Sequence, residues 1–203
     1  MQEKAPSFSG HKSKAIIHEA KGTPIVFLHG YSYDRTIWQK LGITELLTAK
    51  HVPFMALDMP YGAKNECYPK IHDPGINVEI THEATEKTFN RRAPIIVGAS
   101  LGGYIALRYA AKYPVKGLLL IAPARAFEED SLTSTYPKFN FPTRIIWGSE
   151  DNIISGEEMR TLSDRLPNSK LFTYEGAGHS AYKEQPERFK RDLLELYATA
   201  ELT

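Results

Sequence analysis

The sequence predicts an α/β fold in which helices cover both faces of a mostly parallel sheet. Short and nearly continuous apolar runs, such as residues 25–29 and 95–99, are typical of strands that are buried on both faces. Segments with the length and periodicity of helices separate these runs along the chain. An alternation of strands and helices indicates parallel strands that are joined by right-handed crossovers.

The individual elements follow from these two patterns in chain order. The expected strands cover residues 15–19 (a modest candidate), 25–29, 53–58, 95–99, 117–121, 144–147 and 170–174. The expected helices cover residues 36–50, 77–90, 101–113, 155–166 and 186–200. We therefore expect a sheet of six or seven strands, with irregular backbone over residues 122–142.

Length and composition indicate an ordinary globular protein. The 203 residues fit a single domain over residues 1–203, with 42% hydrophobic and 24% charged residues. The net charge of +1 gives no broad electrostatic footprint, so we expect neither nucleic acid nor a membrane as a partner. One cysteine, Cys67, permits no disulfide within the chain, and the N-terminus lacks the apolar run of a signal peptide. These features predict a cytoplasmic protein.

Four unusual stretches fall at the ends of expected strands. They are HGYS (29–32), GASLG (98–102), GSED (148–151) and GAGHS (176–180). In open α/β sheets, sites form at the carboxyl ends of the strands, where the loops project. The sequence therefore predicts one shared site at this edge of the sheet.

Ser100 lies in a G-x-S-x-G pattern between an expected strand and an expected helix. A strand that passes straight into a helix strains the turn residue and lifts its side chain clear of the sheet. Glycines are needed at 98 and 102 because a side chain there would strike the neighbouring strand or helix. The N–H of Leu101, at the start of the helix, is then a free donor beside the serine hydroxyl. The alternative is a tight packing turn without a chemical role.

A serine hydroxyl becomes a nucleophile when a base takes its proton, and His179 is the candidate base. It follows the last expected strand in a glycine-rich loop, from which it can reach across the strand ends. The alternative is that His179 is a loop histidine without a catalytic role. His29 is expected to organise its own loop by hydrogen bonding, and the remaining histidines precede the core, cap a helix end or lie in polar surroundings. These are His11, His18, His51, His72 and His82.

The imidazole needs a buried carboxylate that fixes its tautomer, and Asp151 and Glu150 both follow an expected strand. We choose Asp151 because the apolar residues after it would pack it inward, whereas Glu150 is expected to face water. Either residue could instead be an ordinary polar residue near the start of a helix, without a catalytic role. Asp58, at the end of another strand, is interpreted as a structural residue that braces loops.

The chain order Ser100, Asp151, His179 is that of the α/β-hydrolases, and the chain resembles this superfamily from about Pro24 onward. The stretches that carry the resemblance are FLHGY, ALDMPYG, GASLGGYIALRYAAKYP, WGSEDNII and GAGHSAYKEQPERF. The chain is most similar to small, lidless members that hydrolyse small acyl esters.

The resemblance implies an oxyanion hole made by the backbone N–H groups of Leu101 and Tyr31. Losing one such donor typically costs about 3 kcal/mol of transition-state stabilisation. Larger members carry a helical lid where this chain has only residues 122–142, so we expect a minimal or absent lid and a shallow, open site. Aromatic residues near the expected rim either line an apolar pocket or simply pack. These are Tyr31, Tyr33, Tyr61, Phe127 and Tyr182.

No cofactor or metal site is expected. GAGHSA, residues 176–181, resembles a dinucleotide-binding turn, but too little chain follows it for the required strand and acidic residue. HEATE, residues 82–86, lacks the second histidine of a zinc motif. A phosphate-binding G-x-x-x-x-G-K-[ST] pattern does not occur in the sequence.

These observations predict a serine hydrolase that cleaves small carboxylic esters or related acyl compounds through an acyl-enzyme, with a small-molecule acyl substrate as its partner. One alternative keeps the same triad but transfers the acyl group to another acceptor, or removes acyl groups from amines or thioesters. A second alternative is a non-catalytic binding or scaffold protein, whose mark would be a broken triad. The sequence makes no prediction of the oligomeric state.

Overall fold

The computed structural model describes residues 1–202 and contains an eight-stranded sheet. Its strand order is β1 (Gln2–Lys4), β4 (Ala15–His18), β6 (Phe54–Leu57), β5 (Ile25–Leu28), β7 (Ile95–Ala99), β8 (Gly117–Ile121), β9 (Thr143–Gly148) and β10 (Ser169–Tyr174). The six strands from β6 to β10 in this order are parallel, whereas β1 and β4 pair in antiparallel fashion. The mostly parallel sheet is therefore confirmed, and all the expected strands are present.

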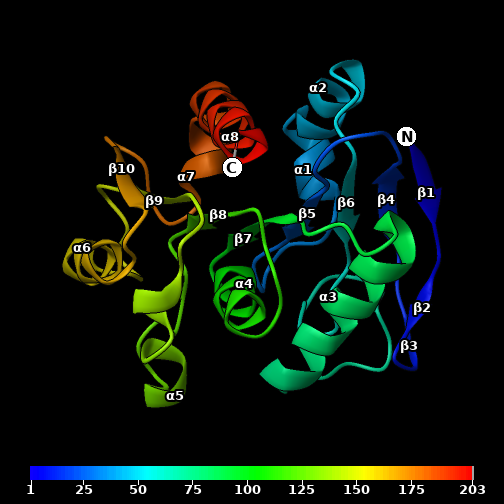
Figure 1. Cartoon of the computed structure of the whole chain (residues 1–203), viewed down its shortest axis with the longest axis horizontal. Coiled ribbons are helices and arrows are strands. Elements are labelled where there is room, and N and C mark those ends of the chain that lie inside the picture. The colour runs from blue at the N-terminus through cyan, green and yellow to red at the C-terminus, as the bar shows by residue number, and fades with distance from the viewer. Residues whose placement is uncertain (203) are drawn as a thin grey trace.

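Strand β1 is the one strand of this sheet that the sequence did not predict, so the sheet has eight strands where six or seven were expected. Its three residues are all exposed, and they pair with β4 at the edge of the sheet (Figure 1). Backbone pairing and surface ion pairs of Glu3 and Lys4 hold this strand, so it leaves no hydrophobic pattern to read. Strands β2 (Ser7–Phe8) and β3 (His11–Lys12) form a separate two-stranded sheet.

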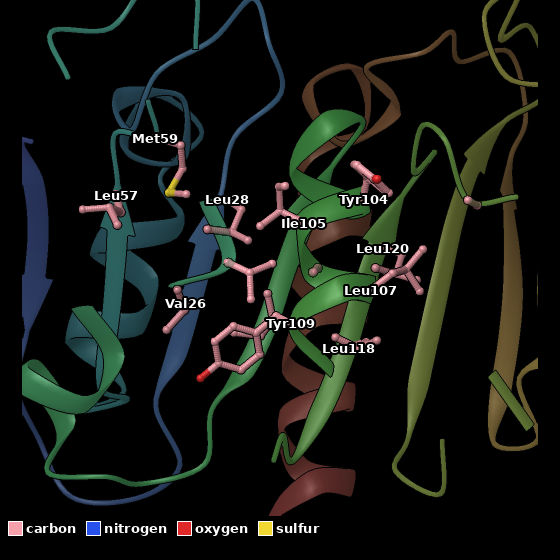
Figure 2. Packing of buried hydrophobic residues seen from close by; sticks show 14 of the residues in the cluster. Val26, Leu28, Leu57, Met59, Tyr104, Ile105, Leu107, Tyr109, Leu118 and Leu120 are labelled. Atoms are coloured by element: carbon pink, nitrogen blue, oxygen red, sulfur yellow. The ribbon is translucent and has the colours of Figure 1, made fainter. Parts of the chain in front are cut away.

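Helices cover both faces of the sheet, as expected. One face carries α3 (Pro74–Phe89), α4 (Leu101–Lys112) and α6 (Gly156–Arg165). The other face carries α1 (Thr36–Lys40), α2 (Ile43–Ala49) and α8 (Pro186–Glu201), and Figure 1 shows the two layers above and below the sheet. Each face has its own apolar core. Figure 2 shows the core under α4, where Val26 and Leu118 from the strands lie with Leu107 from the helix.

Two helices differ from their expected boundaries. The expected helix over residues 36–50 is divided into α1 and α2 by Gly42, whose φ of +68° belongs to the left-handed region. Helix α3 begins at Pro74, three residues earlier than expected. The Asp73 carboxylate caps it by accepting a 2.8 Å hydrogen bond from the Ile76 N–H.

The connection between β8 and β9 is short. It contains only α5 (Asp130–Thr133) and one 3-10 turn, Tyr136–Lys138, which agrees with a minimal lid. A further short helix, α7 (Ala181–Glu184), follows the loop after β10. Within residues 1–202, no helix has both the length and the apolar character that a membrane crossing requires.

Candidate active site

Ser100 occupies the sharp turn between β7 and α4. Its backbone angles, φ +51° and ψ −114°, lie in a region that residues other than glycine rarely adopt. The turn is held on both sides, because the Ser100 N–H donates to Ile121 O at 2.9 Å and the Ser100 carbonyl accepts from the N–H of Ala124 at 3.0 Å. Strain of this kind costs about 1–3 kcal/mol and persists where the surrounding structure enforces it.

The glycines beside Ser100 allow the close packing that this turn needs. A Cβ on Gly98 would lie 2.8 Å from Gly103 Cα in α4, and a Cβ on Gly102 would lie 2.7 Å from the His29 carbonyl oxygen after β5. Both contacts are with backbone atoms, which cannot move aside without distorting the helix or the strand end. The expectation that a side chain at 98 or 102 would strike the helix or the neighbouring strand is therefore confirmed.

Asp151 and His179 are in contact at the ends of β9 and β10. Asp151 Oδ2 lies 2.8 Å from His179 Nδ1, and the Asp151 side chain is 0% exposed. The other oxygen, Oδ1, accepts hydrogen bonds from the N–H groups of Ile153 (2.8 Å) and Ile154 (3.0 Å). In the tautomer that donates from Nδ1 to this carboxylate, Nε2 is left without a proton and faces away from Asp151 as the candidate basic nitrogen. Glu150, the other carboxylate considered, is exposed.

The loop that carries His179 is fixed to the loop that carries Asp151. The Glu150 N–H donates to Ala177 O at 2.9 Å, and the Gly176 N–H donates to Ser149 Oγ at 2.8 Å. These bonds hold the two loops together as one unit, so the Asp151–His179 contact does not depend on the two side chains alone.

The loop that follows β5 lies next to Ser100 and also contacts the histidine loop. A Cβ on Gly30 would lie 3.7 Å from Ser100 Cβ, so the two residues are neighbours. From the same loop, the Tyr33 hydroxyl lies 3.1 Å from Ser180 Oγ, next to His179. Within residues 1–202 the Ser100 hydroxyl itself makes no hydrogen bond. Catalytic hydrogen bonds in structures without substrate are often long and tighten when substrate binds.

The two N–H groups expected to hold an oxyanion border Ser100. Leu101 is the first residue of α4, and Tyr31 follows Gly30. Neither N–H donates a hydrogen bond to another described residue, which leaves both free for a ligand. The Tyr31 side chain is 49% exposed.

His29 has a structural role, as expected. It is fully buried, with Nδ1 donating to Gly30 O at 2.8 Å and Nε2 accepting from the Met59 N–H at 3.0 Å. Asn65 also contacts Nε2 at 3.0 Å. Burial lowers the pKa of His29, so the ring stays neutral and holds the loop in shape.

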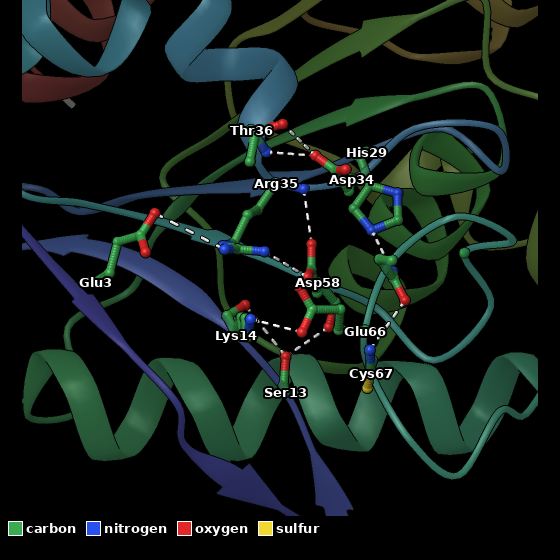
Figure 3. Close-up of polar contacts among 12 residues, drawn as sticks. Glu3, Ser13, Lys14, His29, Asp34, Arg35, Thr36, Asp58, Glu66 and Cys67 are labelled. Atoms are coloured by element: carbon green, nitrogen blue, oxygen red, sulfur yellow. Dashed lines mark hydrogen bonds and ion pairs between the residues drawn. The ribbon is translucent and has the colours of Figure 1, made fainter.

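Asp58 braces the start of α1, which confirms its structural interpretation. Its carboxylate accepts from the Arg35 N–H at 2.7 Å and pairs with Arg35 Nη1 at 2.8 Å, with both side chains buried (Figure 3). The sequence did not indicate Arg35 as this partner. No local pattern joins the two residues, which lie 23 positions apart and meet only because the fold brings the start of α1 to the end of β6.

The remaining side chains near the site divide into packed and exposed groups. Tyr61 and Tyr182 are buried and pack, whereas Tyr33 and Phe127 are half-buried and Tyr31 is exposed.

Cys67 is buried, and burial raises its pKa to about 11, which keeps it a thiol near neutral pH. Within residues 1–202, no group of three or more His, Cys, Asp or Glu side chains is arranged to hold a metal ion.

Comparison with known proteins gives a consistent result. Residues 25–143 match the alpha/beta hydrolase family. Protein ABHD14A of Homo sapiens is 28% identical over 185 residues, a match that covers 88% of this chain and 65% of that protein. The chain thus spans about two thirds of the length of ABHD14A.

A second relative and a solved structure match more of their own length. "Putative protein-lysine deacylase ABHD14B" of Rattus norvegicus is 25% identical over 178 residues, which cover 84% of this chain and 81% of that protein. The crystal structure of a "predicted CIB-like hydrolase" from Thermoplasma acidophilum has a TM-score of 0.84 and 25% identity, and the match covers 96% of both chains.

Proposed function

The chain belongs to the α/β hydrolase family, and from this premise we propose that it is a serine hydrolase that cleaves small carboxylic esters or related acyl compounds. Ser100 is the nucleophile, His179 is the general base and Asp151 orients the imidazole. The observation that carries the proposal is the 2.8 Å contact between the buried Asp151 carboxylate and His179, at the same sheet edge as the strained turn of Ser100.

The proposed reaction uses these groups in two stages. His179 Nε2 takes the proton of Ser100 as Oγ attacks the acyl carbon, and the N–H groups of Leu101 and Tyr31 stabilise the oxyanion. The imidazolium then protonates the leaving group, and an acyl-enzyme remains. Water that loses its proton to His179 releases the acid and restores Ser100.

A second candidate is the removal of acyl groups from amines by the same residues. Two observations favour it. The relative ABHD14B is named as a putative protein-lysine deacylase. The connection over residues 122–142 holds only one short helix and one 3-10 turn in place of a lid, which is compatible with an acyl group that is attached to a bulky molecule.

A fluorophosphonate probe tests the proposed nucleophile. We expect wild-type protein to gain one covalent label at Ser100, because the probe needs a serine that is activated by a base and an oxyanion hole. Ser100→Ala should abolish labelling, and Ser134→Ala, which removes an exposed serine on the β8–β9 connection, should leave it unchanged. Mass spectrometry locates the label. Folded wild-type protein that stays unlabelled contradicts the proposal and favours the scaffold alternative.

Competition then distinguishes the two substrate classes. Esters, thioesters and acetylated lysine peptides are added before the probe, and the loss of labelling is measured for each. Protection by esters alone favours the first candidate, whereas protection by acylated lysine peptides favours the second.

A further inference from the structure

Tyr33 borders the same glycine as Ser100. Its N–H donates to the Gly30 carbonyl at 3.0 Å, and its ring atom Cδ2 lies 3.7 Å from the place that a Cβ on Gly30 would take. Ser100 Cβ lies 3.7 Å from that same place. The loop after β5 therefore holds Tyr33 in a fixed position beside the candidate nucleophile and the candidate oxyanion donor Tyr31.

The other side of Tyr33 contacts the segment that follows His179. Its hydroxyl lies 3.1 Å from Ser180 Oγ, and Lys183 Nζ lies 5.9 Å from the centre of its ring. The Tyr182 ring meets it edge-on, with the ring centres 6.4 Å apart. Three residues of the segment 180–183 thus contact one tyrosine of the loop after β5.

Within residues 1–202, the Tyr33–Ser180 hydrogen bond is the one hydrogen bond that joins the segment 29–34 to the segment 175–185. Separate hydrogen bonds join the histidine loop to the aspartate loop after β9, through the Glu150 N–H and the Ser149 hydroxyl. The candidate base and its carboxylate therefore form one unit, and the candidate nucleophile and oxyanion donors form another. Beyond the pairing of β8 with β9 in the sheet, Tyr33 adds a direct contact between the loop after β5 and the histidine loop.

We propose that Tyr33 is a positioning residue that sets the distance between the His179 imidazole and the Ser100 hydroxyl. The inference rests on the proposed function, since it assigns Tyr33 a task in the same reaction. Proton transfer from Ser100 to His179 requires the two groups within hydrogen-bond reach. A displacement of about 1 Å is known to cost on the order of 100-fold in rate. The Tyr33–Ser180 hydrogen bond fixes the histidine loop against the loop beside Ser100, and it therefore opposes such a displacement.

The test is a double-mutant cycle on the hydrogen bond, with two kinetic readouts. Tyr33→Phe removes only the hydroxyl and keeps the ring contacts, and Ser180→Ala removes its partner. We expect each variant to slow fluorophosphonate labelling and to lower kcat on 4-nitrophenyl acetate by about tenfold. KM should stay within about twofold of wild type, because the Tyr33–Ser180 hydrogen bond positions the catalytic groups and does not bind the ester. The double variant should be no slower than either single variant.

A matched control separates positioning from general stability. The control variant is Tyr113→Phe, which also removes one tyrosine hydroxyl. That hydroxyl donates to the Glu79 carboxylate of α3 at 2.8 Å. This variant should leave labelling and kcat unchanged. Thermal unfolding of each variant confirms that it is folded, and Ser180→Ala carries the test if Tyr33→Phe does not fold. Wild-type rates in both single variants, or losses that multiply in the double variant, overturn the inference. Wild-type protein that is never labelled contradicts the proposed function itself, and with it this inference.

Discussion

At the scale of single residues, two histidines at the same sheet edge differ in how their nitrogens are used. His29 is fully buried, and both of its nitrogens are committed to its own loop and to Met59 and Asn65. His179 is 19% exposed and has one nitrogen committed, to Asp151. A general base needs a free nitrogen, so only His179 is suited to exchange protons with a substrate.

The buried His29 predicts a loss of stability in mild acid. Its pKa is lowered in the folded protein, so below about pH 6.5 the unfolded chain binds a proton that the folded chain does not. The free energy of unfolding should therefore fall as the pH decreases from about 6.5 toward the folded pKa, by up to about 1.4 kcal/mol per pH unit from this group. In His29→Gln this contribution should disappear, as measured by urea unfolding at pH 7.5 and 5.5.

A matched variant serves as the control for this pH effect. His72→Gln removes an exposed histidine and should keep the pH dependence of the wild type. If His29→Gln shows the same pH dependence as wild type, burial of His29 is not its cause.

Local patterns made some residues of the candidate site predictable. Ser100 and Asp151 follow strands that the apolar runs identify, and His179 follows the strand beside that of Asp151, so the Asp151–His179 contact follows from strand order. Their catalytic roles stay predictions. The Tyr33–Ser180 contact joins residues 147 positions apart and depends on side-chain directions, for which the sequence holds no local signal.

At the scale of elements, the candidate nucleophile depends on how closely α4 packs against β5. Gly102, in the first turn of α4, faces the Leu28 and His29 carbonyl oxygens at the end of β5. The glycine is therefore part of the contact between the two elements, and the helix cannot carry a side chain at this position without moving.

Gly102→Ala should destabilise the protein. Alanine is favoured over glycine in a helix by about 1 kcal/mol, but overpacking against two fixed carbonyl groups typically costs about 1–3 kcal/mol, and here the overlap involves backbone atoms. We expect a net decrease in the free energy of unfolding in urea. Gly30→Ala, whose Cβ would meet no atom closer than 3.6 Å, should change it little. A Gly102→Ala protein as stable as wild type contradicts the packing argument.

The elements that the sequence predicted are those with a hydrophobic signature. Every buried strand was found because a run of apolar residues marks it. Strand β1 has no such run, since all three of its residues are exposed. The division at Gly42 and the start of α3 at Pro74 depend on backbone signals, a left-handed glycine and an Asp-Pro cap, which hydrophobic periodicity does not report.

At the scale of the whole molecule, the connection between β8 and β9 is anchored to the core. The connection over residues 122–142 is itself packed, with Leu132, Tyr136 and Phe139 buried and the Tyr136 hydroxyl bonded to Ala126 O. Lids that gate access to active sites must swing between two arrangements. A connection anchored by three buried side chains is not built for this.

The proposed esterase should therefore show no activation at lipid or ester interfaces. We expect its rate on 4-nitrophenyl butyrate to rise hyperbolically with concentration and to show no step where the ester exceeds its solubility. Initial rates measured across that limit, with and without detergent micelles, check this. A sharp increase in rate when aggregates form would contradict the anchored connection.

The sheet order also has a consequence for synthesis of the chain. Strands β9 and β10 are the last two in sequence and occupy one outer edge, while β5, β7 and β8, which surround Ser100, precede them. As the polypeptide leaves the ribosome, the serine and its turn emerge well before the imidazole at position 179 exists. A nascent or prematurely terminated polypeptide therefore has the nucleophile of the proposed reaction without the group that activates it.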